Sequence, residues 1–489
     1  MEKQILRKIN KEYLYIAGLV ALYFIYLVIF CNIRSLWMDD LAQIKIGMQD
    51  NLQNLISENI SLDNNPPLSH ILSYFWIRIV PYGTGWLKLM NIIFVSIGIY
   101  FCGLFAYRRM GLMASLFCVF LAMINKGIIY LAAYTIRPYG LFFFLSAVML
   151  YLYSSRLDEA KNGIIRNNTT LLYSVIMTLM VYTHYFAVLI CITLFIYDLW
   201  YVIKRKIRIR DMVPYPVSAL LFSPWLVAVY KESSARIKNF WPKRPSFSDL
   251  IDMIDELMGR DKMMWIFVAI VLISMVFILF FCEIRYVIYE YLYLIVVPII
   301  SIGLVYVVSK YAKSISSLFV TRYFTGIMPY IIVLGSISIY SLWGWIGNRC
   351  KNRYLYLALV ISTCIMSTAV FARSIKKTYE MQAMYNEPFC EVSEYLKTRK
   401  DYYDNNVMVF NTCNNVDIGW DYYLTEKYEK PSRDVIWYTL ENVDFDGIDI
   451  VYVAELHLPF SERDKSILIE NGFQSIEDVD NIPLTIYYR

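Results

Sequence analysis

Long blocks of apolar residues constrain this chain more than any other feature of its sequence. Residues 170–203 contain one His and one Asp in a run long enough for two membrane crossings, since a helix needs about 20 apolar residues to span the hydrocarbon core. Of all residues, 58% are hydrophobic and 18% are charged, a smaller charged share than soluble proteins have. We therefore predict an α-helical polytopic membrane protein.

The hydropathy pattern predicts about eleven transmembrane helices and an uncleaved first helix rather than a removed signal peptide. Lys and Arg cluster in short loops between the predicted spans, and all of these loops fall on the same side of the membrane. That side is cytoplasmic if the N-terminus is cytoplasmic. We interpret these clusters as topology signals and predict no nucleic-acid partner. The predicted spans are approximately residues 13–31, 88–106, 111–130, 138–154, 170–185, 187–203, 213–230, 263–282, 289–308, 323–345 and 354–372.

An odd number of spans places three further segments on the outer face: residues 32–87, 231–262 and 373–489. The first carries apolar residues at helical spacing over 41–56, which indicates an amphipathic helix in the interface. Pro66-Pro67 then opens a second apolar helix.

The third segment alternates strand-like and helix-like stretches, which predicts a small extracytoplasmic α/β domain. Strands are expected at 407–411, 435–439, 448–453 and 484–489, and helices at 391–400, 420–429 and 461–472. Its Cys390 and Cys413 can form a disulfide or remain two thiols.

Ionisable residues at the outer ends of predicted spans are the candidate functional residues. Asp39 and Asp40 follow the first helix, where they are either solvated acids at a helix start or members of a site. His70, taken alone, fits a packed or interfacial histidine better than a catalytic residue. Arg137, at the end of a span, must snorkel, pair or meet an anion. Arg322 and His184 are similarly placed.

Several short motifs occur in an order that resembles the GT-C glycosyltransferases, and in particular the bacterial members of the protein mannosyltransferase and aminoarabinose transferase superfamily. The resemblance covers roughly residues 1–345. Its elements are a basic N-terminus and first helix followed by W-M-D-D (37–40), N-P-P-L (65–68), R-P-Y (137–139), T-H-Y-F (183–186), S-P-W-L (223–226) and R-Y-F-T-G-I-M-P (322–329).

The resemblance implies an enzyme that takes a sugar from a polyprenyl-phosphate donor and transfers it, with inversion, to a hydroxyl acceptor on the outer face of the bacterial inner membrane. It implies that Asp39 is catalytic and that Asp40 fills a second acidic position, more often Glu in the family. Where the family often has His, this chain has Asn65. Some GT-C enzymes need a divalent cation, so Mg²⁺ or Mn²⁺ stays open.

The chemistry of transfer suggests a role for each candidate. Asp39 would act as general base toward the acceptor hydroxyl, and Asp40 would orient the acceptor or hold Asp39. Guanidinium groups suit a leaving phosphate. Trp241 could stack on a sugar or anchor the loop in the interface. The predicted donor-phosphate residues are Arg137, Arg322, Lys88 and His184, and the acceptor-side residues are His70 and Trp241.

The partners that this hypothesis predicts are membrane lipids, the donor lipid and a glycan, lipid or protein acceptor, with lipopolysaccharide or O-antigen modification preferred. A lipid-linked sugar flippase or transporter is one alternative, although such proteins usually show repeated halves. An O-antigen polymerase or ligase is another, although it typically carries its site in a late outer loop. A membrane scaffold would leave the first outer loop unexplained.

Overall fold

The chain divides into two compact units in the computed structural model: Met1–Cys31 with Ile46–Thr378, which is helical, and Asn32–Lys45 with Tyr379–Arg489, which contains a sheet. The structure describes residues 2–32, 35–63, 65–81, 83–230, 242–281, 285–312, 316–350, scattered residues between 354 and 375, and 389–399, 406–412, 436–437, 440–456, 459–479 and 482–489. The predicted border between residues 372 and 373 stays a prediction.

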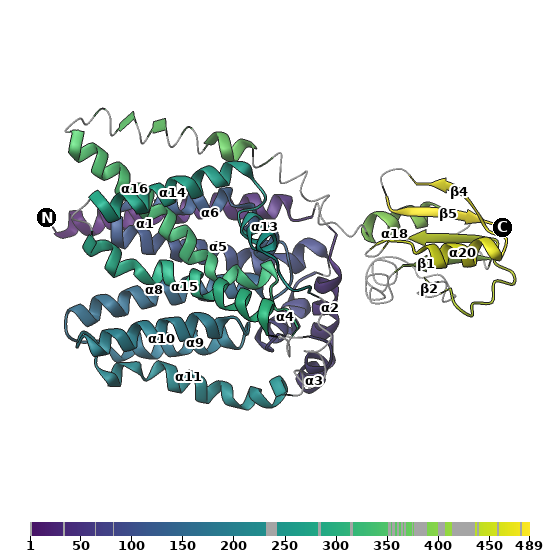
Figure 1. The fold of residues 1–489 in the computed structure, drawn as a ribbon, viewed down its shortest axis with the longest axis horizontal. Helices are drawn as coiled ribbons and strands as arrows, with labels where there is room; N and C mark the ends of the chain where they lie inside the picture. Colours follow the sequence, from purple (N-terminus) through teal and green to yellow (C-terminus); the bar gives the residue numbers. More distant parts are fainter. Residues whose placement is uncertain are drawn as a thin grey trace. The chain divides into compact units, whose positions relative to one another are not determined.

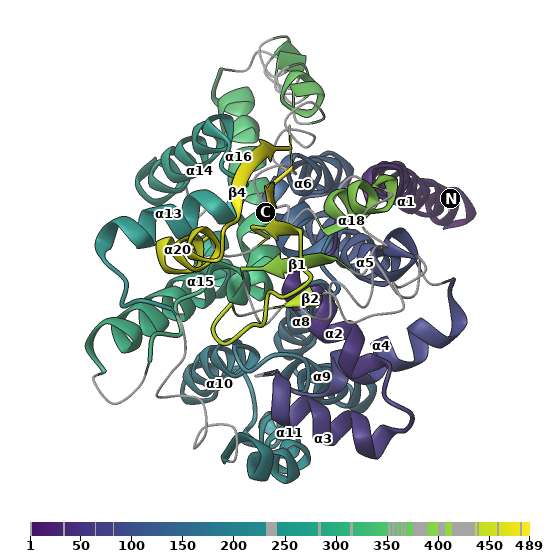
Figure 2. The same ribbon diagram turned by 90° about the vertical axis from the view of Figure 1, so that its right-hand side faces the viewer.

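The helical unit is built from long apolar helices that run side by side, with α3 and α4 crossing one end (Figures 1 and 2). Its elements are α1 (Glu2–Phe30), α3 (Leu52–Leu62), α4 (Leu68–Ile79), α5 (Thr84–Met110), α6 (Leu112–Ile124), α7 (Lys126–Ile128), the π-helix η1 (Ile129–Ala133), α8 (Tyr139–Lys161), α9 (Asn167–Val181), α10 (Ala187–Ile203), η2 (Ile209–Met212), α11 (Pro214–Phe222), η3 (Ser223–Trp225), α13 (Phe247–Leu257), α14 (Lys262–Phe281), α15 (Arg285–Tyr311), η5 (Thr321–Ile327) and α16 (Met328–Cys350).

Six helices in the described residues are long and apolar enough to cross a membrane, and a seventh span results if α6 and the following helical segment count as one. Two shorter apolar helices, Ala187–Ile203 and Met264–Ser274, add to these. The chain is therefore a multi-pass membrane protein. The predicted number of eleven is not confirmed, and the last predicted span, 354–372, falls partly outside the described residues.

Close helix packing in the centre depends on glycine. A Cβ on Gly98 of α5 would lie 2.8 Å from the Phe143 ring of α8, and one on Gly326 of η5 would lie 2.2 Å from Phe142. Small residues let apolar helices approach in this way without a polar contact between them. The α8 helix thus lies in the middle of the unit, and its first turn belongs to the site described below.

The loop after α1, predicted to lie on the outer face, does not form the single helix predicted over residues 41–56. Helix α2 (Met38–Gly47) ends at Gly47, and α3 begins at Leu52 with the Asn51 side chain accepting a hydrogen bond from Asn54 N at 2.9 Å. The N-cap competes with helix continuation because it satisfies the free amides of a new first turn. The expected second helix after Pro66-Pro67 is α4.

A buried ion pair joins α8, α10 and α11 near the C-terminal ends of α8 and α10. The Arg156 guanidinium pairs with the Asp198 carboxylate, which also accepts hydrogen bonds from Tyr153 at 2.9 Å and Tyr215 at 2.8 Å. Both charged side chains are fully buried. The loops expected to share one membrane face also meet here, since Arg109 of α5 pairs with Asp158 of α8 at 2.7 Å.

The second unit contains a five-stranded sheet of order β2-β1-β3-β5-β4, with β1–β2 and β1–β3 parallel and the other pairs antiparallel. Leu468 of α20 packs in one core with Met408 and Phe410. Ser35 donates to Glu391 at 2.9 Å, which connects the 32–45 segment to α18. The elements are α18 (Phe389–Thr398), β1 (Val407–Asn411), β2 (Ile436–Trp437), β3 (Ile450–Ala454), α20 (Glu462–Glu470), β4 (Gln474–Asp478) and β5 (Leu484–Tyr488).

The sequence missed β4. Its residues, QSIED, include one apolar side chain and lack the alternation that identifies a strand. It is an edge strand that pairs with β5 alone and carries a bulge between Ser475 and Glu477, so cross-strand hydrogen bonding rather than burial defines it. The helix expected at 420–429 and the partner proposed for Cys390, Cys413, lie outside the described residues.

The buried pair predicts a large stability difference between two equivalent substitutions. Asp198→Asn leaves the Arg156 charge buried without its carboxylate, so we expect a loss of about 3–5 kcal/mol. Asp158→Asn, on a half-exposed carboxylate, should cost no more than about 1 kcal/mol. Thermal unfolding of the detergent-solubilised proteins measures both, and equal losses would contradict the assigned role of Asp198.

Candidate functional site

The carboxylate of Asp63 lies at the centre of a buried polar cluster. Its Oδ2 accepts a hydrogen bond from His70 Nε2 at 2.8 Å, and its Oδ1 accepts from Arg137 Nη2 at 2.8 Å and Asn65 Nδ2 at 3.1 Å. His70 is fully buried, and Asp63 and Arg137 are each 6% exposed. Because a carboxylate only accepts hydrogen bonds, the His70 proton is on Nε2. We call Asp63, His70 and Arg137 the Asp63 cluster.

Short backbone connections place the loop between α3 and α4 in this cluster. Asp63 is the C-cap of α3, and its N–H donates to the Asn59 carbonyl at 2.9 Å. The Asn59 side chain in turn donates to the Asn65 carbonyl at 3.1 Å. Leu68 N, in the first turn of α4, donates to the Tyr182 carbonyl at 3.1 Å. The proline turn therefore directs Asp63 and His70 toward the 182–186 turn.

Arg137 is positioned by a break in the chain before α8. The helical segment bends by 63° at Asn125, where the sequence predicted one continuous span over 111–130. Asn125 caps the new turn by accepting from Ile128 N at 3.3 Å. Farther along, Asn91 of α5 donates to the carbonyls of Thr135 at 2.6 Å and Arg137 at 2.7 Å. This clamp fixes the backbone just before Pro138 starts α8.

His184 lies in the turn between α9 and α10, inside a cage of aromatic rings. It stacks on Phe142, with ring centroids 5.1 Å apart, and contacts Tyr323, next to Arg322, at 5.2 Å. Nδ1 accepts from Phe186 N at 3.2 Å, which leaves Nε2 to carry the proton. Buried Nε2 has no hydrogen-bond partner among the described residues. The charges of Arg137, Asp63 and Arg322 all act on this ring.

Burial and charge set the protonation states of the two first-loop members. Burial alone raises the pKa of Asp63, but the Arg137 charge and the hydrogen bonds from His70 and Arg137 outweigh it and hold that pKa well below its usual range. Burial lowers the pKa of His70, and the partnership with Asp63 offsets this in part only. The cluster at neutral pH is a carboxylate, a neutral imidazole and a guanidinium.

Three predicted site residues make contacts of their own. Lys88 is buried in α5 and donates to the Cys31 carbonyl at 3.0 Å, where α1 ends and the segment with Asp39 begins. Asp39 and Asp40 occupy the first turn of α2, and Asp40 Oδ2 accepts from Trp37 N at 3.3 Å. Both belong to the 32–45 segment of the second unit. Their catalytic assignment therefore stays a prediction.

Two further predictions are not tested by the described residues. Trp241, offered as a sugar-stacking residue, lies outside them. Among the residues that the structure does describe, no group of three or more His, Cys, Asp or Glu side chains could hold a metal ion. Whether Mg²⁺ or Mn²⁺ takes part therefore remains open.

The arrangement of helices is similar to that of a known membrane enzyme. The crystal structure of ArnT from Cupriavidus metallidurans bound to undecaprenyl phosphate matches with a TM-score of 0.57 and 11% identity, covering 97% of both chains. The apo structure of the same protein matches with a TM-score of 0.58 and 12% identity, again over 97% of both chains. The chain has a GT-C fold. No family model matches the sequence, and no curated protein matches it.

Within this GT-C fold, Asp63 is the residue that the sequence analysis missed. Its place before Pro66-Pro67 is that of an ordinary turn residue, and the sequence predicts Asp39 and Asp40 as the acidic site residues instead. One signal was present, because Asp63 precedes His70 by 7 positions in a segment where Pro66-Pro67 was expected to open a helix. Its partner Arg137, however, is 74 positions away, and no local pattern predicts that pair.

The protonation states predict how the cluster responds to pH. The pKa of His70 is lower in the folded chain than its ordinary value of 6.5. The stabilisation that neutral His70 gives the fold is therefore fully present above pH 6.5 and declines as the pH falls below that value. At neutral pH, His70→Gln should destabilise the protein by about 1–3 kcal/mol. We expect the difference in melting temperature from wild type to narrow between pH 7.5 and 5.5. A constant difference would contradict a neutral His70.

Proposed function

We propose that this chain is an integral membrane glycosyltransferase that transfers a sugar from a polyprenyl-phosphate donor to a hydroxyl acceptor on the outer face of the membrane. One observation carries the proposal: the buried Nε2–H of His184 lacks a hydrogen-bond partner among the described residues, and the charges of Arg137, Asp63 and Arg322 act on its ring. A buried donor among guanidinium groups suits a phosphate oxygen. The ArnT fold, seen with undecaprenyl phosphate, supports the same donor class.

The residues around His184 have distinct parts in the proposed donor site. Arg137 and Arg322 bring guanidinium groups, which stabilise charge developing on a leaving phosphate. The elements that carry these side chains end at the N-termini of α8, α10 and α16, whose dipoles favour an anion. Asp63 and His70 act as positioning residues, because their hydrogen bonds hold one side of the Arg137 fork. Lys88 is the fourth proposed donor-phosphate residue.

The proposed reaction is a single inverting displacement. The acceptor oxygen attacks the anomeric carbon of the donor sugar while the bond from that carbon to the phosphate oxygen breaks. Asp39 takes the hydroxyl proton as general base, and polyprenyl phosphate leaves with its charge held by the guanidinium groups. Asp40 orients the acceptor or holds Asp39. The acceptor is an envelope glycan such as lipopolysaccharide, a lipid or a protein.

Replacing the acidic pair tests the reaction. In the double variant Asp39→Asn, Asp40→Asn, we expect transfer of labelled sugar from a polyprenyl-phosphate donor to be abolished while expression and melting temperature persist, because the base is lost and the fold is not. Asp50→Asn, on an exposed residue of the same loop, is the matched control and should transfer normally. Undiminished transfer by the double variant would exclude Asp39. Label crossing vesicles without a new glycosidic bond would instead identify a transporter.

Replacing His184 tests the donor site separately from the base. His184→Phe keeps a ring stacked on Phe142 but removes the N–H, together with the Nδ1 acceptor of Phe186 N, so stability should fall by only about 1 kcal/mol. Binding of polyprenyl phosphate to the purified protein should weaken about 10–100-fold, the effect of losing a hydrogen bond of about 1.5–3 kcal/mol to a charged group. Unchanged affinity in a stably folded variant would remove His184 from the donor site.

A further inference from the structure

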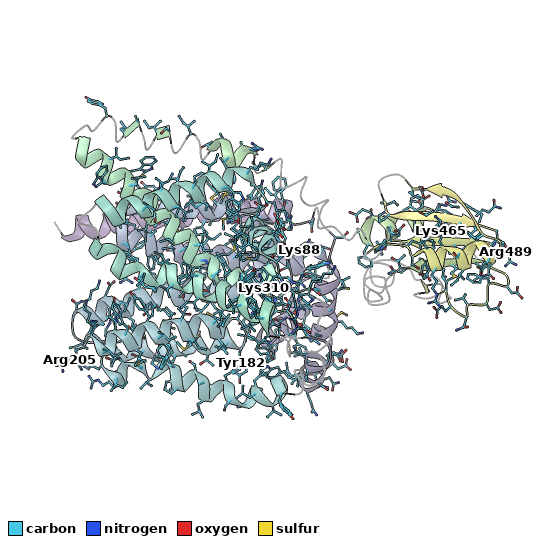
Figure 3. All side chains as sticks on the ribbon, in the orientation of Figure 1. Lys88, Tyr182, Arg205, Lys310, Lys465 and Arg489 are labelled. Carbon is cyan, nitrogen blue, oxygen red and sulfur yellow. The ribbon has the colours of Figure 1, made fainter. Side chains whose placement is uncertain are left out.

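A basic cavity of about 860 Å³ lies where α8 and α10 end. Helix α8 begins beside Arg137 and α10 begins just after the His184 turn, so the length of both helices separates this cavity from the Asp63 cluster. Figure 3 shows Arg205 at the end of the helical unit opposite Lys88 and Tyr182. We call this space the basic cavity. The lining residues that matter here are Lys161, Trp200, Lys204, Arg205, Lys206 and Arg208.

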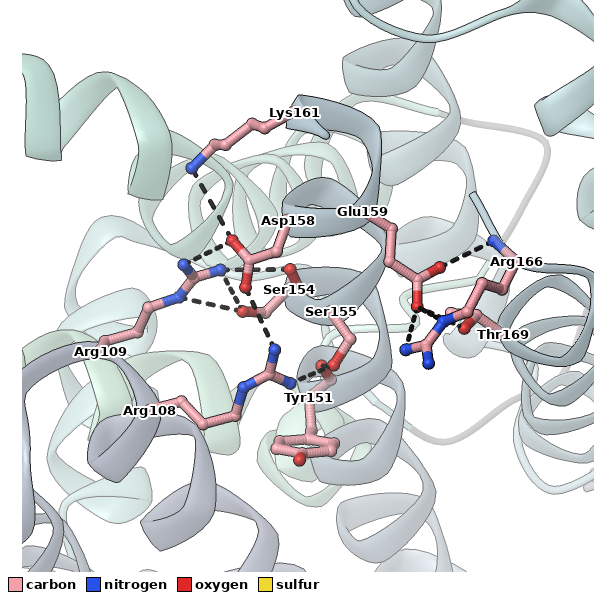
Figure 4. Close-up of polar contacts among 10 residues, drawn as sticks. All are labelled: Arg108, Arg109, Tyr151, Ser154, Ser155, Asp158, Glu159, Lys161, Arg166 and Thr169. Atoms are coloured by element: carbon pink, nitrogen blue, oxygen red, sulfur yellow. Dashed lines mark hydrogen bonds and ion pairs between the residues drawn. The ribbon is translucent and has the colours of Figure 1, made fainter. Parts of the chain in front are cut away.

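Three carboxylates near the basic cavity have basic partners, and the carboxylate of Asp211, which lines the cavity, accepts a hydrogen bond from Arg208 N at 3.1 Å. Asp158 pairs with two arginines of α5, at 2.7 and 3.2 Å, and Glu159 pairs with one from the start of α9 (Figure 4). Asp198 holds the buried arginine of α8. In the described part of the chain, no carboxylate pairs with the side chain of Lys204 or Arg205. The positive charges of Lys204 and Arg205 are therefore available to an anion, whereas Lys161 of the same wall pairs with Asp158 at 3.8 Å.

The backbone after α10 holds these charges in an ordered turn. Lys206 N donates to the Tyr201 carbonyl at 2.9 Å and Arg205 N to Val202 at 2.9 Å, which is a Schellman motif with Arg205 in the left-handed position at φ 55°. Helix α8 ends in the same motif with Gly163, at φ 83°. Glycine is the residue that this position favours. At the end of α10 the chain carries an arginine there instead.

Apolar side chains border the same turn. Ile164, Ile203 and Ile209 are 68–70% exposed, and Trp200 is 41% exposed. Large apolar groups left uncovered at the end of a membrane helix face lipid, and tryptophan favours the headgroup level. The basic cavity thus adjoins an uncovered apolar surface that suits acyl chains.

Basic residues that served only as a topology signal would not need to be held in a folded segment around a cavity. Here the Arg208 guanidinium donates to the Gly163 carbonyl at 3.0 Å, and Asp211 accepts from Arg208 N at 3.1 Å. These bonds fold the 204–211 segment against the end of α8. We propose that the basic cavity binds the phosphate-bearing headgroup of an anionic phospholipid from the leaflet on this side, with Lys204 and Arg205 as its main contacts.

Native mass spectrometry of the full-length protein in detergent, titrated with phosphatidylglycerol or with phosphatidylcholine, tests this proposal. Wild type should bind the anionic lipid more tightly. Arg205→Gly should weaken that binding about fivefold, and Lys204→Gln with Arg205→Gln about thirtyfold, on the basis of about 1 kcal/mol for each basic residue near an anionic lipid. Lys243→Gln with Arg244→Gln, two exposed basic residues before α13, is the charge-matched control and should bind as wild type does.

Arg205→Gly separates lipid binding from folding, because glycine relieves the left-handed strain and should leave the melting temperature equal or higher. Weaker binding by this stable variant supports the basic cavity as the site. Wild-type affinity in both cavity variants would overturn the proposal, as would equal binding of phosphatidylcholine. Displacement of the lipid by soluble glycerol phosphate or inorganic phosphate would show that a free phosphate, rather than a lipid, is the ligand.

Discussion

The Asp63 carboxylate connects two parts of the chain that are far apart in sequence, the loop before α4 and the start of α8. A buried guanidinium without a counter-charge would be costly in this apolar unit. Arg137 meets that requirement through Asp63, which takes a further hydrogen bond from His70. The pairing fixes the direction of the guanidinium fork and leaves His184 among the resulting charges. The loop therefore helps to form the proposed donor site instead of only covering it.

Polar groups gather at both ends of the helical unit and serve different purposes there. At the N-terminal ends of α8 and α10, the charged side chains are buried and interlocked, which suits a preorganised site for a reacting phosphate. At the C-terminal ends of the same helices, a buried pair between Arg156 and Asp198 holds the bundle, while the more exposed basic residues surround a cavity. The proposed donor site and the proposed lipid site thus occupy opposite ends of one scaffold.

Sequence reasoning succeeded where the relevant physics is local. The apolar runs correspond to helices, the Pro66-Pro67 turn opens α4, and β1, β3 and β5 lie where alternating or apolar stretches were expected. It failed where a short polar signal interrupts a pattern. Asn51 divides the expected 41–56 helix, Asn125 bends the expected 111–130 span, and the polar edge strand β4 is defined by its neighbour. Helix capping and edge-strand pairing depend on only one or two hydrogen bonds. The spacing of apolar residues along the sequence does not reveal such bonds.

The sequence by itself determined that the chain is a membrane protein with a small α/β domain, and its motif order indicated the GT-C class, because hydropathy and motif spacing are readable along the chain. It also marked Arg137, Arg322 and His184 as residues at span ends. Only the tertiary structure decided that Asp63 and His70 join Arg137, and that Asn91 clamps the turn before α8. Those contacts join residues up to 74 positions apart, and a pairing over that separation arises from how the helices pack.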